Sequence, residues 1–598
     1  MPTYKSPVQD NLFLLHDVFQ IERYADVPGY ADLSPDITEA TLVEAAKLCD
    51  GVLAPLNRVG DTEGCTRHED GSVSTPKGFK EAFRQFRDGG WNALKFPEEY
   101  GGQGLPGALN SVLSEFLAGS NLAFWMYAGL TQGAIADLLH HGTEEQKRTY
   151  LPKMISGEWT GTMNLTEPQA GTDLGIVRTK AARTADGSFT ITGTKIFISA
   201  GEHDLAENII HLVLARIEGA PQGTKGLSLF VVPKFLPTAE GAIGARNKLS
   251  CGSTEHKMGI HGNSTCVMNF DGATGWLVAE ENRGLPAMFT MMNHARLEVG
   301  VHGIAISEAA YQNAAAYARE RLQGRALTGK KRPDKPADPL VVLPDVRRML
   351  MTMRATTEGA RALAVWTAIQ GDLSFGAPDP QVREAAEDHM ALLTPVIKAF
   401  STDMGFTNAV LAQQIWGGHG YIAENGMEQF VRDARINQIY EGANGVQAMD
   451  LVGRKLGLNG GRPIKSFAAE VEGYLREHAK TEALAPHVKA LGAALGDLQQ
   501  AALWLVKHGA SDPDALGAGS SDFLNLFSLV ALGYMWCRMT EVAAAKLAAT
   551  PGAGEAHLRS KLVVGRFFVE KMLPETTFLL ARIKTGAATV MELPEEAF

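Results

Sequence analysis

A stretch of β-type sequence interrupts a chain whose pattern is otherwise helical. This change of pattern restricts the possible folds more than any other feature of the sequence. Residues 37 to about 155 are rich in helix-forming residues, most clearly in Asn121–His140. From about 160 to 286 the chain carries short β-branched apolar runs between turn signals, such as Ile209–Ala215. Helical patterns then continue to the C-terminus. This order predicts a mainly α fold with a central β domain.

The last quarter of the chain predicts a second helical region. Glycines between 457 and 462 interrupt the helical pattern. Leucines from Leu484 to Leu505 then recur at close to heptad spacing, which indicates an additional helical bundle. An earlier polar insert, Lys330 to Lys335, is expected to be a solvated loop.

Composition excludes several function classes. The 598 residues carry a formal net charge of -11, so a nucleic acid partner is not expected. Five scattered cysteines without a C-x-x-C pair argue against a disulfide framework or a zinc ribbon, and sixteen histidines show no paired metal-ligand spacing. We therefore expect no metal site.

The N-terminus lacks a signal layout, which favours a cytoplasmic protein. The longest apolar run, Phe523 to Cys537, is shorter than the roughly 20 residues that a membrane-spanning helix needs. We expect this run to be a buried helix and the chain to have no membrane span.

Three short segments are candidates for chemistry. Residues 164–173 read NLTEPQAGTD at the entry to the β domain, a mixture of hydroxyls, a proline-fixed turn and a glycine that suits an anion or a heterocycle but also an ordinary turn. Residues 414–421 read QIWGGHGY, and residues 439–445 read IYEGANG. Glycines at the end of a helix allow a phosphate to approach the backbone closely.

Taken together, these blocks resemble the acyl-CoA dehydrogenases, a family of flavoproteins, over nearly all of residues 37 to 460. The T-E-P-x-A-G-[ST]-D, Gly-Gly-x-Gly-Tyr and I-Y-E-G blocks occur in the family's order and spacing. The head of the chain and the added C-terminal bundle further resemble a large bacterial subgroup, which includes 3-methylmercaptopropionyl-CoA and long-chain fatty acyl-CoA dehydrogenases.

The resemblance implies a domain plan with a barrel-like middle domain. We expect an N-terminal extension (1–36), an N-terminal helical domain (37–160), a middle β domain (161–285), a catalytic four-helix bundle (286–460) and an additional C-terminal helical domain (465–598). The last resembles extensions that occupy the space where related tetramers pair their dimers, so the resemblance implies a homodimer.

The implied reaction is FAD-dependent α,β-dehydrogenation of an acyl-CoA to a trans-2-enoyl-CoA. Glu441, in the I-Y-E-G block, would remove the α proton while the β hydride passes to N5 of FAD. The thioester α proton is a weak acid, so the base must be desolvated and the enolate oxygen stabilised, in part by the Glu441 backbone N–H. Glu298 is a minor alternative base, because some family members place the base on an earlier helix.

The resemblance also implies two sets of ligand-binding residues. The residues implied to bind FAD form three groups. Met163, Leu165, Thr166, Gly171, Thr172, Phe197 and Ser199 belong to the β domain, and Ala443 and Gly445 follow the base. Arg321, Gln414, Gly417 and Gly418 match family residues that usually contact the FAD of a second subunit. The substrate set is Thr172, Asn293, Arg296, Tyr440 and Gly442.

The chain departs from the family pattern at several of these positions. Phe197 and Ser199 stand where Trp and Thr are common, and Ala443 and Gly445 replace a frequent Thr and Gln. In the segment that follows Arg321, the family commonly has an aromatic residue before the glycine, and this chain lacks it before Gly324. Phe197 still supplies an apolar wall at the flavin ring but lacks the indole N–H of Trp. Ala443 and Gly445 remove two side-chain hydrogen bonds to the flavin's ADP portion but leave backbone contacts possible.

The implied partners are an acyl-CoA substrate and electron-transfer flavoprotein as the electron acceptor. Two other functions are alternatives, and the presence of Glu441 counts against the second. A flavin-dependent oxidase or monooxygenase would keep the FAD residues and react with O2, and a non-catalytic acyl-CoA- or FAD-binding assembly factor would be expected to lack Glu441. Fatty acyl-CoA and 3-methylmercaptopropionyl-CoA both remain candidate substrates.

Overall fold

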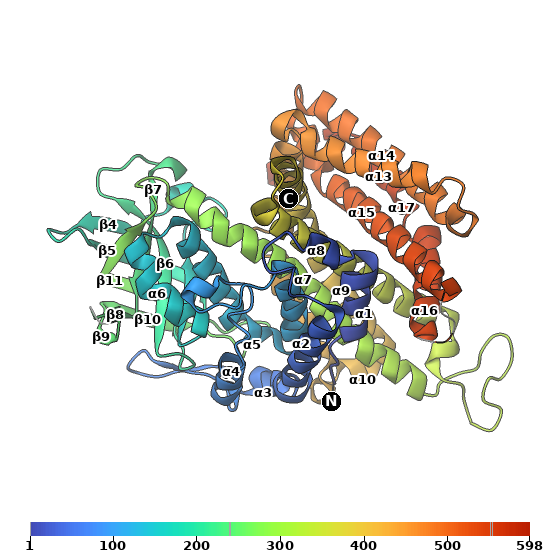
Figure 1. Cartoon of the computed structure of the whole chain (residues 1–598), viewed down its shortest axis with the longest axis horizontal. Coiled ribbons are helices and arrows are strands. Elements are labelled where there is room, and N and C mark those ends of the chain that lie inside the picture. The colour runs from blue at the N-terminus through green and yellow to red at the C-terminus, as the bar shows by residue number, and fades with distance from the viewer. Residues whose placement is uncertain (1, 239–240, 550–551, 553) are drawn as a thin grey trace. The chain divides into compact units, whose positions relative to one another are not determined.

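The computed structural model (Figure 1) describes residues 2–238, 241–549, 552 and 554–598. The chain divides into two compact units. Unit 1 comprises Met1–Leu42, Pro106–Glu115 and Val299–Phe598, and unit 2 comprises Val43–Leu105 and Phe116–Glu298. Helices α2 (Pro35–Leu48), α5 (Gly107–His141) and α7 (Gly284–Glu320) contribute residues to both units.

Unit 2 contains the predicted β domain, and five of its strands close into a ring. Strand β11 pairs with β5, β5 with β4, β4 with β6, β6 with β7, and β7 with β11. Strands β10 and β3 extend the sheet from β11 and β6. The bounds are β3 Trp159–Asn164, β4 Lys180–Arg183, β5 Phe189–Ser199, β6 Asn208–Ile217, β7 Leu227–Pro233, β10 Leu249–Thr254 and β11 Thr265–Val278. The barrel-like middle domain is thus confirmed.

Strand β6 shows why part of this domain reads as continuous apolar sequence. Ile210, Leu212 and Leu214 belong to the core shared with the helices, whereas Val213 and Ala215 belong to the core inside the barrel. Because both faces of the strand are buried, every residue from 208 to 217 is buried and no polar alternation remains.

The helices of unit 2 carry clear local signals. Helix α6 begins with a capping box, in which Thr143 and Gln146 each accept a hydrogen bond from the other's backbone N–H. Helix α5 is kinked at Asn121, whose Oδ1 accepts the Phe124 N–H at 3.0 Å and caps the following half, so the strongly apolar stretch from residue 121 forms the half after the kink. The bounds are α3 Ala54–Glu63, α4 Phe79–Asp88 and α6 Glu144–Ser156; two small hairpins join β1 Thr66–Arg67 to β2 Val73–Ser74 and β8 Phe235–Pro237 to β9 Ile243–Arg246.

Unit 1 is built on long helices that approach closely through glycines. A Cβ on Gly405 of α9 would lie 2.5 Å from the carbonyl oxygen of Gly303 on α7. Only glycine permits this backbone contact, which fixes where the two helices cross. The bounds in this unit are α1 Val8–Leu12, α8 Pro344–Gly376, α9 Pro380–Trp416, α10 Gly418–Tyr421, α11 Met427–Arg435 and α12 Asn444–Asp450.

The additional C-terminal helices, orange to red in Figure 1, are α13 Arg462–Glu477, α14 Ala485–Gly509, α15 Pro513–Ala549, α16 Glu555–Lys571, α17 Glu575–Ile583 and α18 Ala588–Met591. The repeating leucines of α14 are buried, as the heptad spacing predicts. Helix α15 contains the apolar run 523–537 but extends to 37 residues, so the run's length underestimates the helix. By length and composition α15 could cross a membrane, yet 67% of its most apolar window is buried within the protein.

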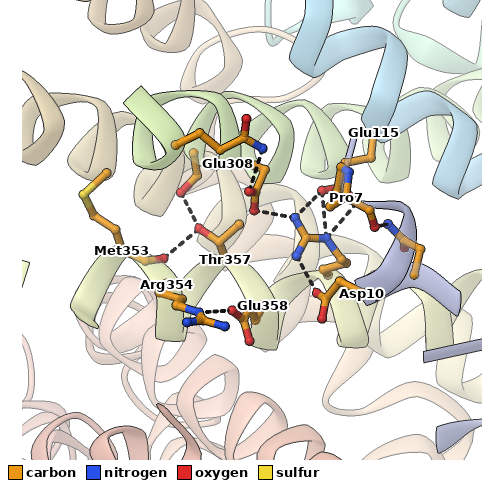
Figure 2. Close-up of polar contacts among 12 residues, drawn as sticks. Pro7, Asp10, Glu115, Glu308, Met353, Arg354, Thr357 and Glu358 are labelled. Carbon is orange, nitrogen blue, oxygen red and sulfur yellow. Dashed lines mark hydrogen bonds and ion pairs between the residues drawn. The ribbon is translucent and has the colours of Figure 1, made fainter. Parts of the chain in front are cut away.

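A buried cluster of charges ties the N-terminal segment and α16 to the long helices of unit 1. Figure 2 shows the part of this cluster that contains Asp10, Glu115, Glu308 and Glu358. The Arg361 guanidinium donates to Asp10 at 2.6 Å, to Glu115 at 2.6 Å and to Glu308 at 2.7 Å. In the same cluster, Lys561 donates to Glu358 at 2.7 Å. Segments far apart in the sequence are therefore joined by desolvated ion pairs.

Candidate active site

Glu441, the predicted base, lies in a strained turn of unit 1 between the 3-10 helix Ile436–Gln438 and α12. Its φ is +56°, and that of Gly442 is +80°. A glutamate in the left-handed region costs about 1–3 kcal/mol and persists only where the surroundings hold it. Such strain at a carboxylate favours a functional role over that of an ordinary surface residue.

Side chains from α9 and α12 hold this turn. The Asn444 side-chain amide donates to the Asp403 carboxylate at 2.7 Å, and buried Lys398 donates to Asn444 Oδ1 at 2.8 Å. The Gln447 amide donates to the carbonyls of Glu441 and Gly442 at 3.3 and 3.2 Å. The Gln447 bonds satisfy two backbone carbonyls that the turn would otherwise leave without a helical partner, and the bonds of Asn444 fix the start of α12 against α9.

Tyr440, beside the predicted base, is fixed through its hydroxyl. The hydroxyl donates to Asn437 Oδ1 at 2.6 Å and lies 3.2 Å from Nδ1 of His302. Burial, with the Glu441 charge as a lesser cause, raises the pKa of Tyr440 well above its usual value. Burial also lowers the pKa of His302 to about 3, so this histidine is neutral. His302 carries no motif of its own, and the sequence did not identify it.

Two further predicted residues at this turn also belong to unit 1. Ala443 precedes the first residue of α12 as its N-cap, and Gly445 is exposed within the helix. A Cβ on Gly445 would meet no other atom within 4 Å. Packing inside the protein therefore does not require glycine at this position.

The flavin-ring residues lie along one rim of the barrel in unit 2. Thr166 follows β3, and its carbonyl accepts the N–H of Ile196 on β5 at 2.9 Å, which places 163–166 beside 197–199. Phe197 has a φ of +59° and a side chain that is 59% exposed. The hydroxyls of Thr166 and Ser199 have no hydrogen-bond partner within the described part of the chain. An accessible aromatic face beside two available hydroxyls fits a flavin ring, which carries polar atoms along one edge.

A buried ion pair supports this rim, and sequence reasoning missed it. Lys195 donates to the Leu165 carbonyl and to Glu167 Oε1, each at 2.9 Å. Burial lowers the pKa of Lys195 to about 8 against the opposing charge of Glu167. Burial works to raise the pKa of Glu167, but the Lys195 charge and hydrogen bonds from Thr179 and Arg178 outweigh it and lower it to about 2. The sequence signal that could have identified this ion pair is a lysine at a core-facing position of β5.

Gly171 and Thr172, the last two predicted ligand-binding residues of the T-E-P block, follow a tight turn. In this turn the backbone N–H groups of Glu167 and Ala170 each donate to the other residue's carbonyl. Gly171 and Thr172 are exposed, and a Cβ on Gly171 would meet no other atom within 4 Å. These two residues are thus accessible to a ligand, as the resemblance implies.

The substrate residues on α7 belong to unit 2. Arg296 is buried and donates to Asn293 Oδ1 at 3.4 Å, so it is not a surface helix residue. Glu298, the alternative base, is 7% exposed and lies 3.9 Å from Nε2 of His294, which also contacts the Lys95 ammonium at 3.0 Å. Burial and Lys95 lower the pKa of His294 well below its usual value. Glu298 thus lies beside the neutral His294 and, through it, near the Lys95 ammonium, both in unit 2.

The predicted pyrophosphate residues gather at a pocket of about 480 Å³ in unit 1. Arg321, Gly417 and Gly418 line it, and exposed Gln414 adjoins it in the sequence. Within the described chain, the Arg321 guanidinium has no ion pair or hydrogen bond. A cation without an internal partner, beside two glycines with open space where a Cβ would stand, fits an anionic diphosphate.

The comparisons with known proteins cover the whole chain. Residues 50–158, 162–273 and 282–456 match the families described as Acyl-CoA dehydrogenase, N-terminal domain, middle domain and C-terminal domain. Residues 464–594 match the family described as Acetyl-CoA dehydrogenase C-terminal like.

Three relatives illustrate the similarity. The chain is 43% identical to a 3-methylmercaptopropionyl-CoA dehydrogenase of Ruegeria pomeroyi, over 97% of this chain and 98% of the relative. It is 36% identical to a broad-specificity linear acyl-CoA dehydrogenase of Mycobacterium tuberculosis, over the full length of both. A crystal structure of an acyl-CoA dehydrogenase complexed with FAD from Bacillus anthracis has a TM-score of 0.74 at 20% identity, covering 100% of this chain and 94% of the other.

Proposed function

Since this chain belongs to the acyl-CoA dehydrogenase family, whose members are FAD-dependent oxidoreductases, we propose that it converts an acyl-CoA thioester into a trans-2-enoyl-CoA with Glu441 as the base. The observation that carries the assignment of the base is the left-handed backbone of Glu441, held by Gln447 and Asn444 next to the fixed Tyr440.

The residues around the turn have distinct tasks in the proposed reaction. The Glu441 carboxylate takes the α proton, and the electron pair of the broken C–H bond forms the new double bond as the β hydrogen leaves as hydride. The acceptor for that hydride would be N5 of FAD, which is the chemistry that the cofactor would supply when bound. The Glu441 backbone N–H donates to the thioester oxygen as negative charge develops there. Gly442 leaves room for the thioester.

Two groups of residues would hold the cofactor. Met163, Leu165, Thr166, Phe197 and Ser199 would contact the ring, with Gly171 and Thr172 beside the chain of the cofactor or substrate. Arg321, Gln414, Gly417 and Gly418 would contact the diphosphate, with Ala443 and Gly445 contributing backbone. Among the described residues, the hydroxyls of Thr166 and Ser199 and the Arg321 guanidinium have no internal partner, which supports this assignment.

For the substrate we propose a linear acyl-CoA, either a fatty acyl-CoA or 3-methylmercaptopropionyl-CoA, bound in part by Asn293 and Arg296. The names of the two relatives support this choice. We further propose electron-transfer flavoprotein as the acceptor, a homodimer as the assembly and a cytoplasmic location. Residues 1–36, 37–160, 161–285, 286–460 and 465–598 remain our proposed domain plan.

The test is a panel of acyl-CoAs, including 3-methylmercaptopropionyl-CoA, mixed anaerobically with the purified yellow protein. The flavin absorbance should bleach with a subset of the panel, and kcat/KM values ranked with electron-transfer flavoprotein as acceptor identify the substrate. Rapid peroxide formation under air would instead support an oxidase or monooxygenase. Bound FAD with no bleaching by any acyl-CoA would support a binding factor.

A further inference from the structure

A buried histidine on α7 lies against the turn of the proposed base, and the proposed reaction assigns it no task. His302 is 6% exposed, and its Nδ1 lies 3.2 Å from the Tyr440 hydroxyl. Both residues belong to unit 1, and Tyr440 directly precedes Glu441 in the chain. A contact from α7 therefore reaches the residue next to the base.

The direction of this hydrogen bond follows from the other partner of the Tyr440 hydroxyl. The hydroxyl donates its single proton to Asn437 Oδ1 at 2.6 Å, so its oxygen accepts from His302. Burial lowers the pKa of His302 to about 3, so the ring is neutral and carries one proton, which we assign to Nδ1. The Tyr440 hydroxyl is thus held by a donor on α7 and by an acceptor in the 3-10 helix Ile436–Gln438.

The backbone that carries His302 has little freedom to move. The next residue, Gly303, lies where α7 crosses α9, and a Cβ on it would stand 2.3 Å from the Ser401 carbonyl oxygen. A side chain at this position would overlap the α9 backbone, so the two helices are in direct backbone contact. His302 is therefore attached to a rigid helix crossing.

The same crossing also supports the turn through α9. Asp403, two residues after Ser401, accepts from the Gln438 side-chain amide at 2.6 Å and from the Asn444 side-chain amide at 2.7 Å. Gln438 precedes Glu441 by three residues, and Asn444 follows it by three. Helix α9 thus holds the chain before and after the base, and His302 adds a contact from α7 to the adjacent residue.

A base on a strained backbone depends on such a frame, because a displacement of about 1 Å can cost a factor of about 100 in rate. We propose that His302 is a positioning residue, which acts through the Tyr440 hydroxyl to hold the Glu441 turn so that the carboxylate meets the α carbon of the acyl thioester. This inference rests on the proposed function, since Glu441 is the base of that reaction. His302 itself exchanges no proton with the substrate.

Anaerobic stopped-flow bleaching of the flavin in the holoenzyme separates positioning from binding. His302→Leu removes the donor, whereas His302→Asn keeps an N–H near the place of Nδ1. Tyr440→Phe removes the hydroxyl, and the double variant His302→Leu/Tyr440→Phe completes a double-mutant cycle. His487→Leu is the matched control, because His487 is similarly buried, at 5% exposed, but lies on α14 beside Gly565 of α16.

We expect the limiting bleaching rate of His302→Leu to fall roughly 10- to 100-fold, while the apparent Kd for the acyl-CoA changes little. His302→Asn should recover most of the rate. Tyr440→Phe should also be slower than the parent. The double variant should be no slower than the slower single variant, because both changes break the same contact. His487→Leu should bleach at the parent's rate.

Backbone hydrogen exchange, measured by mass spectrometry without substrate, reports on the turn independently of activity. In His302→Leu, exchange should rise in the peptide that spans residues 436–447 and stay at the parent's level in α14 and in the strands of the barrel. A rise throughout the chain would mean a general loss of stability and would count against a positioning role.

Several results would overturn the inference and leave the proposed function intact. These are bleaching of His302→Leu at the parent's rate, an equal loss in His302→Asn, or losses that multiply in the double variant. A parent whose flavin no acyl-CoA bleaches would overturn both. Circular dichroism and the thermal midpoint show whether each variant is folded. If His302→Leu does not fold, Tyr440→Phe decides, since an unchanged rate and unchanged exchange of residues 436–447 in that variant would contradict the role of the hydroxyl.

Discussion

The Lys195 ammonium donates to the Glu167 carboxylate at 2.9 Å while both side chains are buried in unit 2. The same ammonium donates to the Leu165 carbonyl, so one lysine fixes both sides of the T-E-P turn. The T-E-P block thus has a structural role in addition to the proposed contact with FAD. Its glutamate anchors the residues that are to meet the flavin.

Replacing Lys195 with Met should destabilise the protein strongly. The change leaves the Glu167 charge buried without its cation, a loss of about 3–5 kcal/mol in comparable buried pairs. The thermal unfolding midpoint measures the effect. Lys47→Met is the matched control, because Lys47 pairs with Glu44 on an exposed helix face and should change little. Equal midpoints for the two variants would show that the pair does not support the rim.

Asp137 should make the stability of the protein fall as the pH rises. Neither of its carboxyl oxygens has a hydrogen-bond partner in the described residues, and burial raises its pKa to about 8. Between about pH 4 and pH 8 the unfolded chain loses this proton and the folded protein keeps it. The free energy of unfolding therefore decreases through that window, by up to about 1.4 kcal/mol for each pH unit.

Asp137→Asn removes this titration and should be more stable than the parent at pH 7.5 but closer to it at pH 5. Thermal midpoints at the two pH values check the sign. A difference between variant and parent that stays constant, or grows toward low pH, would exclude a protonated Asp137 in the folded protein.

Replacing Arg361 should weaken the attachment of the N-terminal segment to the helices of unit 1. Burial works to raise the pKa of Asp10, but the charges of Lys561 and Arg361 outweigh it and hold that pKa well below its usual range. In Arg361→Met, Glu115 and Glu308 lose their shared cation, and a loss of several kcal/mol is expected. Limited proteolysis near the N-terminus and the thermal midpoint measure the effect. Arg559→Met, which removes an exposed i,i+4 pair with Glu555, should leave both unchanged.

The sequence predicted the architecture because hydrophobic periodicity reports burial directly. The β domain and the leucine face of α14 follow from local patterns, whereas the kink at Asn121 was not predicted. Periodicity did not reveal which faces meet: β6 is buried on both sides by segments far apart in the sequence. The full extent of α15 was also missed, since polar residues at its ends hide a helix that continues past the apolar run.

The residues of the candidate site were predicted from motifs, and a motif does not identify the other residues that hold its members in place. Glu441 was found through its I-Y-E-G block, but its left-handed backbone and the Gln447 bonds that hold it depend on a turn that the block does not encode. His302 and Tyr317 belong to no motif. They contact Tyr440, in the turn after the 3-10 helix Ile436–Gln438, and Trp416, at the end of α9. Such partners become visible only once the helices are packed.

The central claim is that Glu441 removes the α proton, and anaerobic stopped-flow bleaching of the flavin tests it most directly. The parent is mixed with its best acyl-CoA and compared with Glu441→Gln and Glu298→Gln, each at matched FAD content. We predict that Glu441→Gln bleaches roughly 10²- to 10⁴-fold more slowly, the usual contribution of a general base, while Glu298→Gln remains near the parent. Bleaching of Glu441→Gln at the parent's rate, or a comparable loss confined to Glu298→Gln, would contradict the account.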